Sequence, residues 1–128
     1  MNPRVVDSTF KVGRLHKARE FAEIAALLFD SATRNSDHGD VYVTMAIHSG
    51  IASSDVICAS KLSEYSAGES HTAAVALLKK ANTEAATLLS KLLSMKTKSA
   101  YGHRAVTATE VRTAESTHKK LLTIAEQT

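Results

Sequence analysis

Proline occurs once in the chain, at Pro3, so residues 4–128 lack the residue that most strongly breaks an α-helix. Alanine, the strongest helix former, fills 20 of the 128 positions. Residues branched at Cβ are scattered and do not alternate with polar residues, as they would in half-buried strands. The sequence therefore predicts an all-α fold.

Composition places the chain among globular proteins. Hydrophobic residues make up 44% and charged residues 23%, and the length fits one domain, here residues 1–128. The single cysteine, Cys58, cannot form a disulfide within the chain. No apolar run approaches the roughly 18 residues of a membrane span, and the N-terminus lacks the apolar core of a signal peptide. We therefore expect a cytoplasmic protein with no membrane association.

Apolar residues recur at spacings of three and four in several segments, the pattern of helices with one buried face. The links between these segments are short, and short links make successive helices antiparallel neighbours. The sequence therefore predicts an up-and-down bundle of about five helices, over residues 7–33, 41–64, 70–81, 84–101 and from 107 onward.

Polar residues and glycine mark the predicted helix ends. The N-caps are expected within Asp37–Asp40 for the second helix, at Ser70 for the third and at Thr107 for the last. Glu110 completes a capping box with Thr107. Gly102 is expected to end the fourth helix in the left-handed conformation.

The second predicted helix should be the most buried. Ala46, Gly50 and Ser54 recur every four residues and allow another helix to approach closely. Glycine inside a helix costs about 1 kcal/mol relative to alanine, so Gly50 indicates a packing role. Cys58 lies in the same apolar stripe, where a free thiol acts as a small hydrophobic side chain rather than as a nucleophile.

Metal and cofactor sites are not predicted. The densest group of metal-ligating residue types, Asp37–Asp40, is explained by turn and capping preferences. The five glycines never cluster, which excludes a phosphate-binding glycine loop of the P-loop or Rossmann type.

Three polar residues fall on predicted helix faces. His48 and Asp55 lie seven residues apart, about 10 Å along one face, and either line a polar groove or satisfy partners inside the bundle. His118 lies in the apolar stripe of the last helix and is expected to be a core or interface histidine rather than a catalyst.

A stretch near the end of the fourth predicted helix combines basic side chains with a tyrosine: Lys96, Lys98, His103 and Arg104 surround Tyr101. Basic groups bind phosphate oxygens and an aromatic face stacks a base, as in sites for single-stranded nucleic acid. The alternative is that the lysines only complement the dipole of the helix end. The net charge of +3 is small, so this local cluster carries the hypothesis.

The order of the segments resembles a HEPN domain, a helical family of many prokaryotic toxin, antitoxin and phage-defence systems. Residues 15–28 resemble the first helix of the family, residues 41–57 the second, and residues 70–78 a short segment introduced by a histidine, here His71. Residues 92–102 fall where the family carries its signature, an arginine followed by four to six residues and a histidine. In active members this signature forms an RNA-cleaving site across a homodimer interface.

The signature is altered in this chain, because Lys96 stands at the arginine position and Tyr101 at the histidine position. Lysine lacks the planar fork of arginine, and a phenol is a poor general base at neutral pH. His103 is a candidate substitute for the missing histidine. The resemblance implies as catalytic residues Lys96, Tyr101 and His103, and as RNA- or nucleotide-binding residues Lys98, Arg104, His48, Asp55 and His71.

A literal match to the signature also occurs at Arg112 and His118. Six positions along a straight helix place these side chains about 120° apart, and the pair lies one helix beyond the expected place. We therefore treat this match as coincidental.

Two functions follow as hypotheses. The first is an RNA-directed role in a toxin–antitoxin or phage-defence system, in which a homodimer binds RNA and cleaves it without metal if the altered signature still permits catalysis. The alternative is a noncatalytic homodimeric interaction module that binds a partner protein, such as a nucleotidyltransferase or antitoxin, or a nucleotide. Whether the chain is an enzyme stays open.

Overall fold

The computed structural model describes residues 4–66 and 70–128. Within them the chain is helical, which confirms the predicted all-α fold, and the five longest helices pack together. The helices are α1 (Ser8–Arg34), α2 (Gly39–Leu62), α3 (His71–Ala81), α4 (Thr83–Leu93), α5 (Lys96–Ala100) and α6 (Ala108–Glu126).

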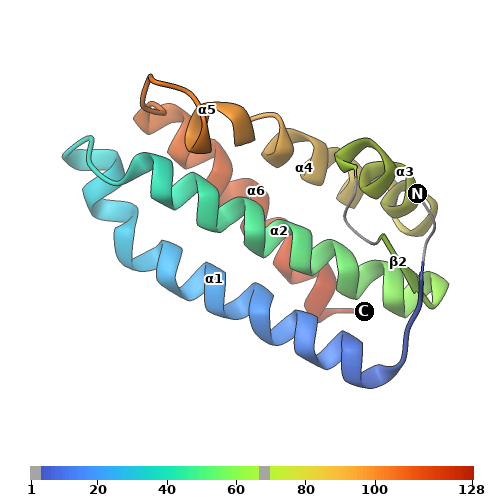
Figure 1. Ribbon diagram of the computed structural model, residues 1–128. Helices are drawn as coiled ribbons and strands as arrows, with labels where there is room; N and C mark the ends of the chain where they lie inside the picture. The colour runs from blue at the N-terminus through green and yellow to red at the C-terminus, as the bar shows by residue number, and fades with distance from the viewer. Residues whose placement is uncertain (1–3, 67–69) are drawn as a thin grey trace.

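The central helix of the bundle is α2 (Figure 1). It contacts every other helix, with α1 on one side, α6 behind it and α3, α4 and α5 on the other side. The helices α1, α2, α4 and α6 run in alternating directions. Twelve residues of α2 are buried, more than in any other described helix, as the sequence predicts.

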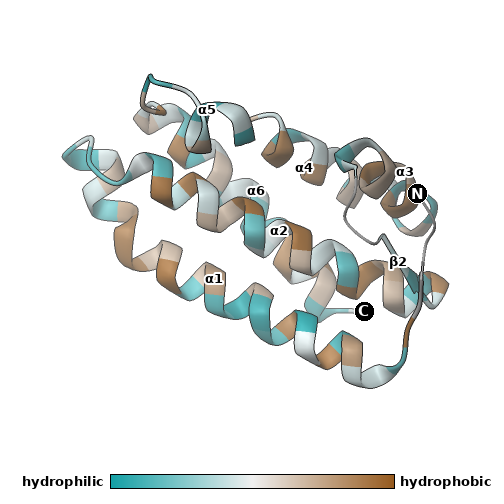
Figure 2. Cartoon of the chain, viewed as in Figure 1, coloured by the Kyte–Doolittle hydropathy of each residue, from teal (hydrophilic) through white to brown (hydrophobic). Residues whose placement is uncertain are grey.

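The hydrophobic core consists of two clusters along the bundle. One lies around Tyr42, Val43 and Val111. The other lies around Ile57 and Leu78. Hydrophobic and hydrophilic residues alternate along the helices, as Figure 2 shows, and this amphipathic pattern allows α4 and α6 to bury one face in these clusters.

Among the described residues, α2 is the one helix long and apolar enough to cross a membrane. However, 67% of its apolar 18-residue stretch is buried inside the bundle, as expected for the core helix of a helical protein.

Close packing against α4 explains the glycine in the middle of α2. A Cβ atom added to Gly50 would lie 2.5 Å from Cδ1 of Leu92, a fully buried side chain. The predicted packing role of Gly50 is therefore confirmed. Cys58 is buried as well, and burial raises the pKa of its thiol to about 12, so it packs as a hydrophobic side chain and is not a thiolate at neutral pH.

The sequence predicts a helix cap correctly where the capping side chain bonds a backbone amide in the first turn of its own helix. Ser70 accepts a hydrogen bond from the Ala73 amide (3.2 Å). Thr107 and Glu110 form the predicted capping box, with reciprocal bonds of 3.1 and 2.8 Å. These caps are formed between residues three apart in the sequence, which is why local patterns identify them.

The start of α2 differs from the capping expectation. Its N-cap is His38, inside the predicted range, but the residue is left-handed (φ 66°) and its side chain makes no capping bond. Asp40 instead accepts a hydrogen bond from the Val106 amide (3.0 Å), which ties the start of α2 to the link before α6. A long-range partner thus takes the side chain of Asp40, one of the residues in the range where the sequence predicts the cap.

The prediction of one continuous fourth helix over residues 84–101 is wrong. The Ser94 hydroxyl donates to the Lys91 carbonyl (2.6 Å), and the Met95 amide donates to the Leu92 carbonyl, only three residues back (3.0 Å). Such bonds compete with the α-helical pattern and tighten the turn. They separate α4 from the short helix α5.

The predicted left-handed cap at Gly102 is also wrong, because its φ lies outside the left-handed region. The amides of Tyr101 and Gly102 both donate to the Thr97 carbonyl, at 2.9 and 2.8 Å. This convergence closes α5 without a left-handed residue.

Two short strands correct the expectation of a chain without strands. β1 (Arg4–Val5) pairs antiparallel with β2 (Glu64–Tyr65). The ladder holds the N-terminal segment against the link after α2, a pairing across some 60 residues that periodicity cannot predict. Of the break predicted between the second and third helices, residues 67–69 lie outside the described residues.

Candidate functional site

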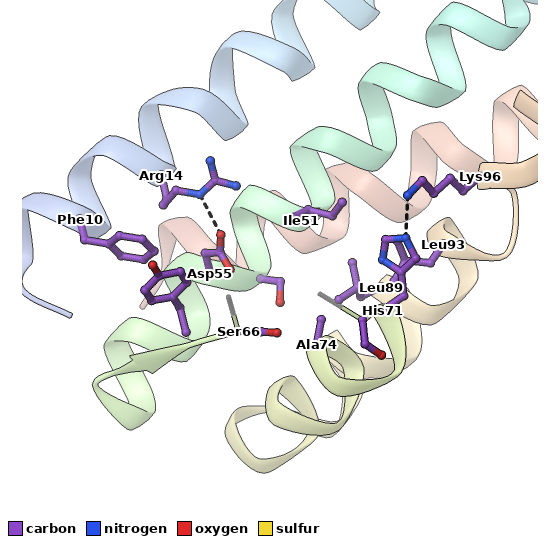
Figure 3. A pocket seen from close by; sticks show the side chains of 13 residues that line it. Phe10, Arg14, Ile51, Asp55, Ser66, His71, Ala74, Leu89, Leu93 and Lys96 are labelled. Atoms are coloured by element: carbon purple, nitrogen blue, oxygen red, sulfur yellow. Dashed lines mark hydrogen bonds and ion pairs between the residues drawn. The ribbon is translucent and has the colours of Figure 1, made fainter. Parts of the chain in front are cut away.

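A cavity of about 450 Å³ opens between α1, α2 and the α3–α5 side of the bundle (Figure 3). We call it the Asp55 cavity. Its polar side chains come from five different elements, and its apolar wall comes mainly from α2 and α4. The lining residues are Phe10, Arg14, Ile51, Ser54, Asp55, Tyr65, Ser66, Ser70, His71, Ala74, Leu89, Leu93 and Lys96.

An ion pair lies at one end of the Asp55 cavity. Arg14 Nε donates to Asp55 Oδ2 at 2.8 Å, and the two side chains are 26% and 14% exposed. Burial raises the pKa of Asp55 to about 6, although the guanidinium of Arg14 opposes this rise. The carboxyl group can therefore exchange a proton near neutral pH while it faces the cavity.

A lysine–histidine pair lies at the other end, with Ile51 between the two polar pairs in Figure 3. Lys96 Nζ and His71 Nε2 are 2.8 Å apart. Burial and the charge of Lys96 lower the pKa of His71, so a neutral imidazole accepts the hydrogen bond from the ammonium group. Among the described residues, no carboxylate lies within ion-pair distance of Lys96.

A second, smaller hollow of about 260 Å³ adjoins the cavity, because Ile51 and Lys96 line both. We call it the Tyr101 hollow. Tyr101 is 75% exposed at its edge, and the His48 ring stacks on Phe21 of α1 with 5.2 Å between the ring centroids. The Asp55 cavity and the Tyr101 hollow together form what we call the α2 groove.

Five of the predicted site residues meet in the α2 groove: His48, Asp55, His71, Lys96 and Tyr101. The sequence predicts that His48 and Asp55 either line a polar groove or satisfy partners inside the bundle. Asp55 does both, because it lines the groove and pairs with Arg14. His48 lines the groove and is exposed.

The other predicted residues lie outside the groove. Lys98 pairs with Glu110 of the α6 capping box (2.9 Å), and this bond is the largest contribution that lowers the pKa of Glu110. His103 and Arg104 are exposed in the link between α5 and α6. The three candidate catalytic residues therefore do not form one site, because Lys96 and Tyr101 line the Tyr101 hollow and His103 does not.

His118 is a core residue, as predicted. It is 1% exposed, and its Nε2 shares a hydrogen bond of 3.1 Å with the Tyr42 hydroxyl. Arg112 is exposed on the same helix, so the literal signature match does not bring its two residues together.

Sequence analysis missed Arg14, Phe10 and Tyr65. Phe10 and Tyr65 pack together with ring centroids 4.2 Å apart and form an aromatic wall of the Asp55 cavity. Arg14 could have been found, because it lies four residues before the buried Ala18, on the apolar stripe of the first predicted helix. A charged residue on such a stripe needs a partner, here Asp55.

Within the described part of the chain, no three His, Cys, Asp or Glu side chains are placed to hold a metal ion together. No protein-family model, curated protein or solved structure matches the chain. The resemblance to HEPN domains therefore stays a prediction, and function is inferred below from the chemistry of the α2 groove.

Proposed function

We propose that this protein is a HEPN-like RNA-binding protein of a toxin–antitoxin or phage-defence system, and that single-stranded RNA lies along the α2 groove. The observation that carries the proposal is the position of Lys96. Its ammonium group lines both parts of the groove and has no carboxylate partner among the described residues. A half-buried cation of this kind is available to a phosphate oxygen.

Aromatic and imidazole rings beside Lys96 provide stacking surfaces. Tyr101 is largely exposed at the edge of the hollow, and His48 is held flat against Phe21. Every base has a face that stacks on such rings, so this arrangement favours single strands of varied sequence. The exposed His103 and Arg104 in the next link add basic groups along the path of the backbone.

The same geometry favours binding over cleavage. Cleavage without metal requires an acid and a base on opposite sides of one phosphate, with each within hydrogen-bond reach of its proton. His103 lines neither part of the groove, and the phenol of Tyr101 is a poor base. We therefore place RNA binding first and treat cleavage as a separate result of the same experiment.

Filter binding with labelled tRNA and unstructured mRNA fragments tests the proposal. We expect Lys96→Ala to weaken retention about tenfold and to reduce the slope of log affinity against log salt by about one. Tyr101→Ala should also weaken retention about tenfold, because one stacking surface is lost. Tyr101→Phe keeps the ring and should bind like the wild type. If the wild type cleaves RNA and Tyr101→Phe binds it without cleavage, the phenol has a catalytic role.

Lys120→Ala is the matched control, since Lys120 is an exposed lysine of α6 outside the groove. Its affinity should stay close to that of the wild type. Absence of salt-dependent retention in the wild type, or equal losses in Lys96→Ala and Lys120→Ala, would contradict RNA binding in the α2 groove.

A second candidate function, the homodimeric interaction module, is favoured by α1. Its outer surface exposes Val12, Ile24 and Leu27, which are 68%, 51% and 77% exposed. The first half of this helix is mainly basic, with Lys11, Arg14, Lys17 and Arg19, and the acidic residues Glu20, Glu23 and Asp30 follow, before Arg34 in the last turn. Antiparallel pairing of two α1 helices would place opposite charges together and Val12 near Leu27 of the second copy.

Size-exclusion chromatography with light scattering tests this pairing. We expect the wild type at twice the chain mass of 13.7 kDa and Leu27→Glu at the mass of one chain. Val41→Glu, at an exposed apolar residue of α2, is the control and should remain a dimer. A monomeric wild type would contradict the homodimer and would leave this surface to a different partner, such as the nucleotidyltransferase or antitoxin that the resemblance implies.

A further inference from the structure

A second groove lies between α3 and α4, on the side of α2 that faces away from α1 (Figure 1). Asn82 is both the C-cap of α3 and the N-cap of α4, so these two helices form a tight hairpin. Two hollows of about 550 and 390 Å³ lie between them and are continuous, because Val75, Ser90 and Ser94 line both. We call the two hollows together the α3–α4 groove.

The α3–α4 groove carries positive charge that the chain itself does not neutralise. Lys79 of α3 and Lys91 of α4 line the groove and are exposed. Among the described residues, neither lysine has a carboxylate within ion-pair distance. Residues 71–95 contain three lysines and one acidic residue, Glu84. The two ammonium groups in the groove are therefore available to carboxylates of another molecule.

The floor of the groove is apolar. Val75 is half-buried, and Ala86 is only 4% exposed. Two hydroxyl groups in the groove are already used inside α4, since Thr87 and Ser94 each donate to a carbonyl of this helix, at 3.3 and 2.6 Å. The groove thus offers a ligand an apolar floor flanked by two cations.

This combination differs from a surface for nucleic acid or for a membrane. The residues that line the groove include no phenyl, phenol or indole ring on which a base could stack, and the imidazole of His71 is already bonded to Lys96. A membrane surface requires exposed large apolar side chains that enter the lipid. In the described part of the chain, such side chains lie on α1, at the start of α2 and at Tyr101. A polypeptide with carboxylate and apolar side chains matches the groove better.

A helix fits the groove better than an extended strand does. The backbone groups of α3 and α4 are bonded within each helix, so this hairpin has no free edge to which a strand could add. A third helix brings its own bonded backbone and places apolar residues, at spacings of three and four, between two others. Each helix of the hairpin has 11 residues, or about 16 Å, which matches about three turns of a docked helix.

From this arrangement we infer that the α3–α4 groove docks an acidic amphipathic helix of a partner protein, with its carboxylates at Lys79 and Lys91 and its apolar face on the groove floor. This docking site goes beyond the proposed function, because Lys96 and Tyr101, on which RNA binding depends, do not line it. The α3–α4 groove and the α2 groove adjoin at His71, which lines both.

Fluorescence anisotropy with a labelled synthetic helix of about three turns tests the inference. The probe has leucine and alanine at spacings of three and four and glutamate beside them, and a lactam link on its outer face keeps this short peptide helical. The control peptide has lysine in place of every glutamate. We expect the acidic peptide to bind in the micromolar range and the lysine peptide to bind at least about tenfold more weakly. No binding of the acidic peptide at millimolar concentration, or equal affinity of the two peptides, would overturn the inference.

Neighbouring lysines of α3 provide a matched pair of variants, since Lys79 and Lys80 are both exposed and only Lys79 lines the groove. At physiological salt, where charges are screened beyond about 8 Å, Lys79→Glu should weaken binding of the acidic peptide at least about tenfold. Lys80→Glu should stay within about twofold of the wild type. Equal losses in the two variants would overturn the inference.

The shape of the groove is tested by a second matched pair. Ser90 is exposed and lines both hollows, so Ser90→Trp should fill the groove and abolish binding of the acidic peptide. Ala76 is exposed on α3 and does not line the groove, so Ala76→Trp should bind like the wild type. Circular dichroism checks that both variants are folded. Unchanged affinity in folded Ser90→Trp would overturn the inference.

Other occupants of the groove are outcomes of the same comparison. Oligouridine, and vesicles of phosphatidylserine and phosphatidylcholine, are titrated with the wild type, Lys79→Glu and Lys80→Glu, and light scattering measures self-association. An interaction with RNA, with vesicles or with a second copy that only Lys79→Glu abolishes would overturn the assignment to a partner helix. Lys96→Ala should lose RNA retention and keep the acidic peptide, so failure of the proposed function is distinguished from failure of this docking site.

Discussion

Replacing Gly50 by leucine is expected to lower the free energy of unfolding by about 3 kcal/mol, because it overpacks the contact between α2 and α4. Even the first added carbon would lie 2.5 Å from Cδ1 of Leu92. Leu92 is fully buried and Leu89 lies nearby, so the side chains that would have to move are themselves enclosed. The higher helix propensity of leucine, worth under about 1 kcal/mol, cannot offset this cost.

Gly13→Leu is the matched control, since Gly13 also lies inside a helix but a Cβ atom there meets nothing within 4 Å. Only the propensity gain remains at this position, and the variant should be more stable than the wild type by about 0.7 kcal/mol. Urea unfolding followed by circular dichroism measures both. If Gly50→Leu were as stable as Gly13→Leu, the close approach of α2 and α4 would be wrong.

In a variant without the Asp55 carboxylate, lowering the pH from 7 to 4 should reduce the free energy of unfolding by about 3 kcal/mol through the protonation of His118. Burial lowers the pKa of His118 from its ordinary 6.5 to about 4, and the charge of Lys119 adds a smaller effect in the same direction. The unfolded chain therefore takes up this proton before the folded chain does. The stabilising contribution is complete above pH 6.5 and is lost as the pH falls through about 4.

Asp55 acts in the opposite direction over nearly the same range. Burial raises its pKa from 3.8 to about 6, so the folded chain binds this proton more tightly than the unfolded chain. Its contribution is complete below pH 3.8 and is lost as the pH rises through about 6. The wild type should therefore show a much smaller net change between pH 4 and pH 7 than either group alone would produce.

Unfolding in urea at several pH values separates the two groups. Between pH 7 and pH 4, Asp55→Asn should lose about 3 kcal/mol of unfolding free energy through His118. The double variant Asp55→Asn/His118→Gln lacks this titrating group and should lose about 3 kcal/mol less than Asp55→Asn does. Equal acid losses in the single and the double variant would mean that His118 is not held neutral in the core.

The helices were predictable from the sequence to the extent that local interactions determine them. Periodicity located the long helices, and Ser70 and Thr107 marked two N-caps because each bonds an amide three residues ahead. The break at Ser94 was missed because the sequence does not show whether a serine hydroxyl in a helix will bond a nearby carbonyl, as that of Ser94 bonds the Lys91 carbonyl. Pairing of β1 with β2 was missed because its partners are far apart in the sequence.

The candidate site was predicted as single residues but not as an arrangement. Spacing placed His48 and Asp55 on one face of the second helix, and the basic cluster identified Lys96 and Tyr101. Tertiary packing alone determines that Arg14 of α1 meets Asp55, and that His71 of α3 meets Lys96. Such contacts across 41 and 25 residues leave no periodic signal, so neither the cavity nor its two different ends could be predicted.

The most direct test of RNA binding in the α2 groove is a nuclear magnetic resonance titration of the isotopically labelled protein with oligouridine, followed through the backbone amides. We predict that the largest shifts fall on His48, Ile51, Lys96 and Tyr101, and that they diminish as salt is added. Shifts confined to the outer surface of α1 or to α6, or no shifts at all, would contradict a nucleic-acid site in this groove.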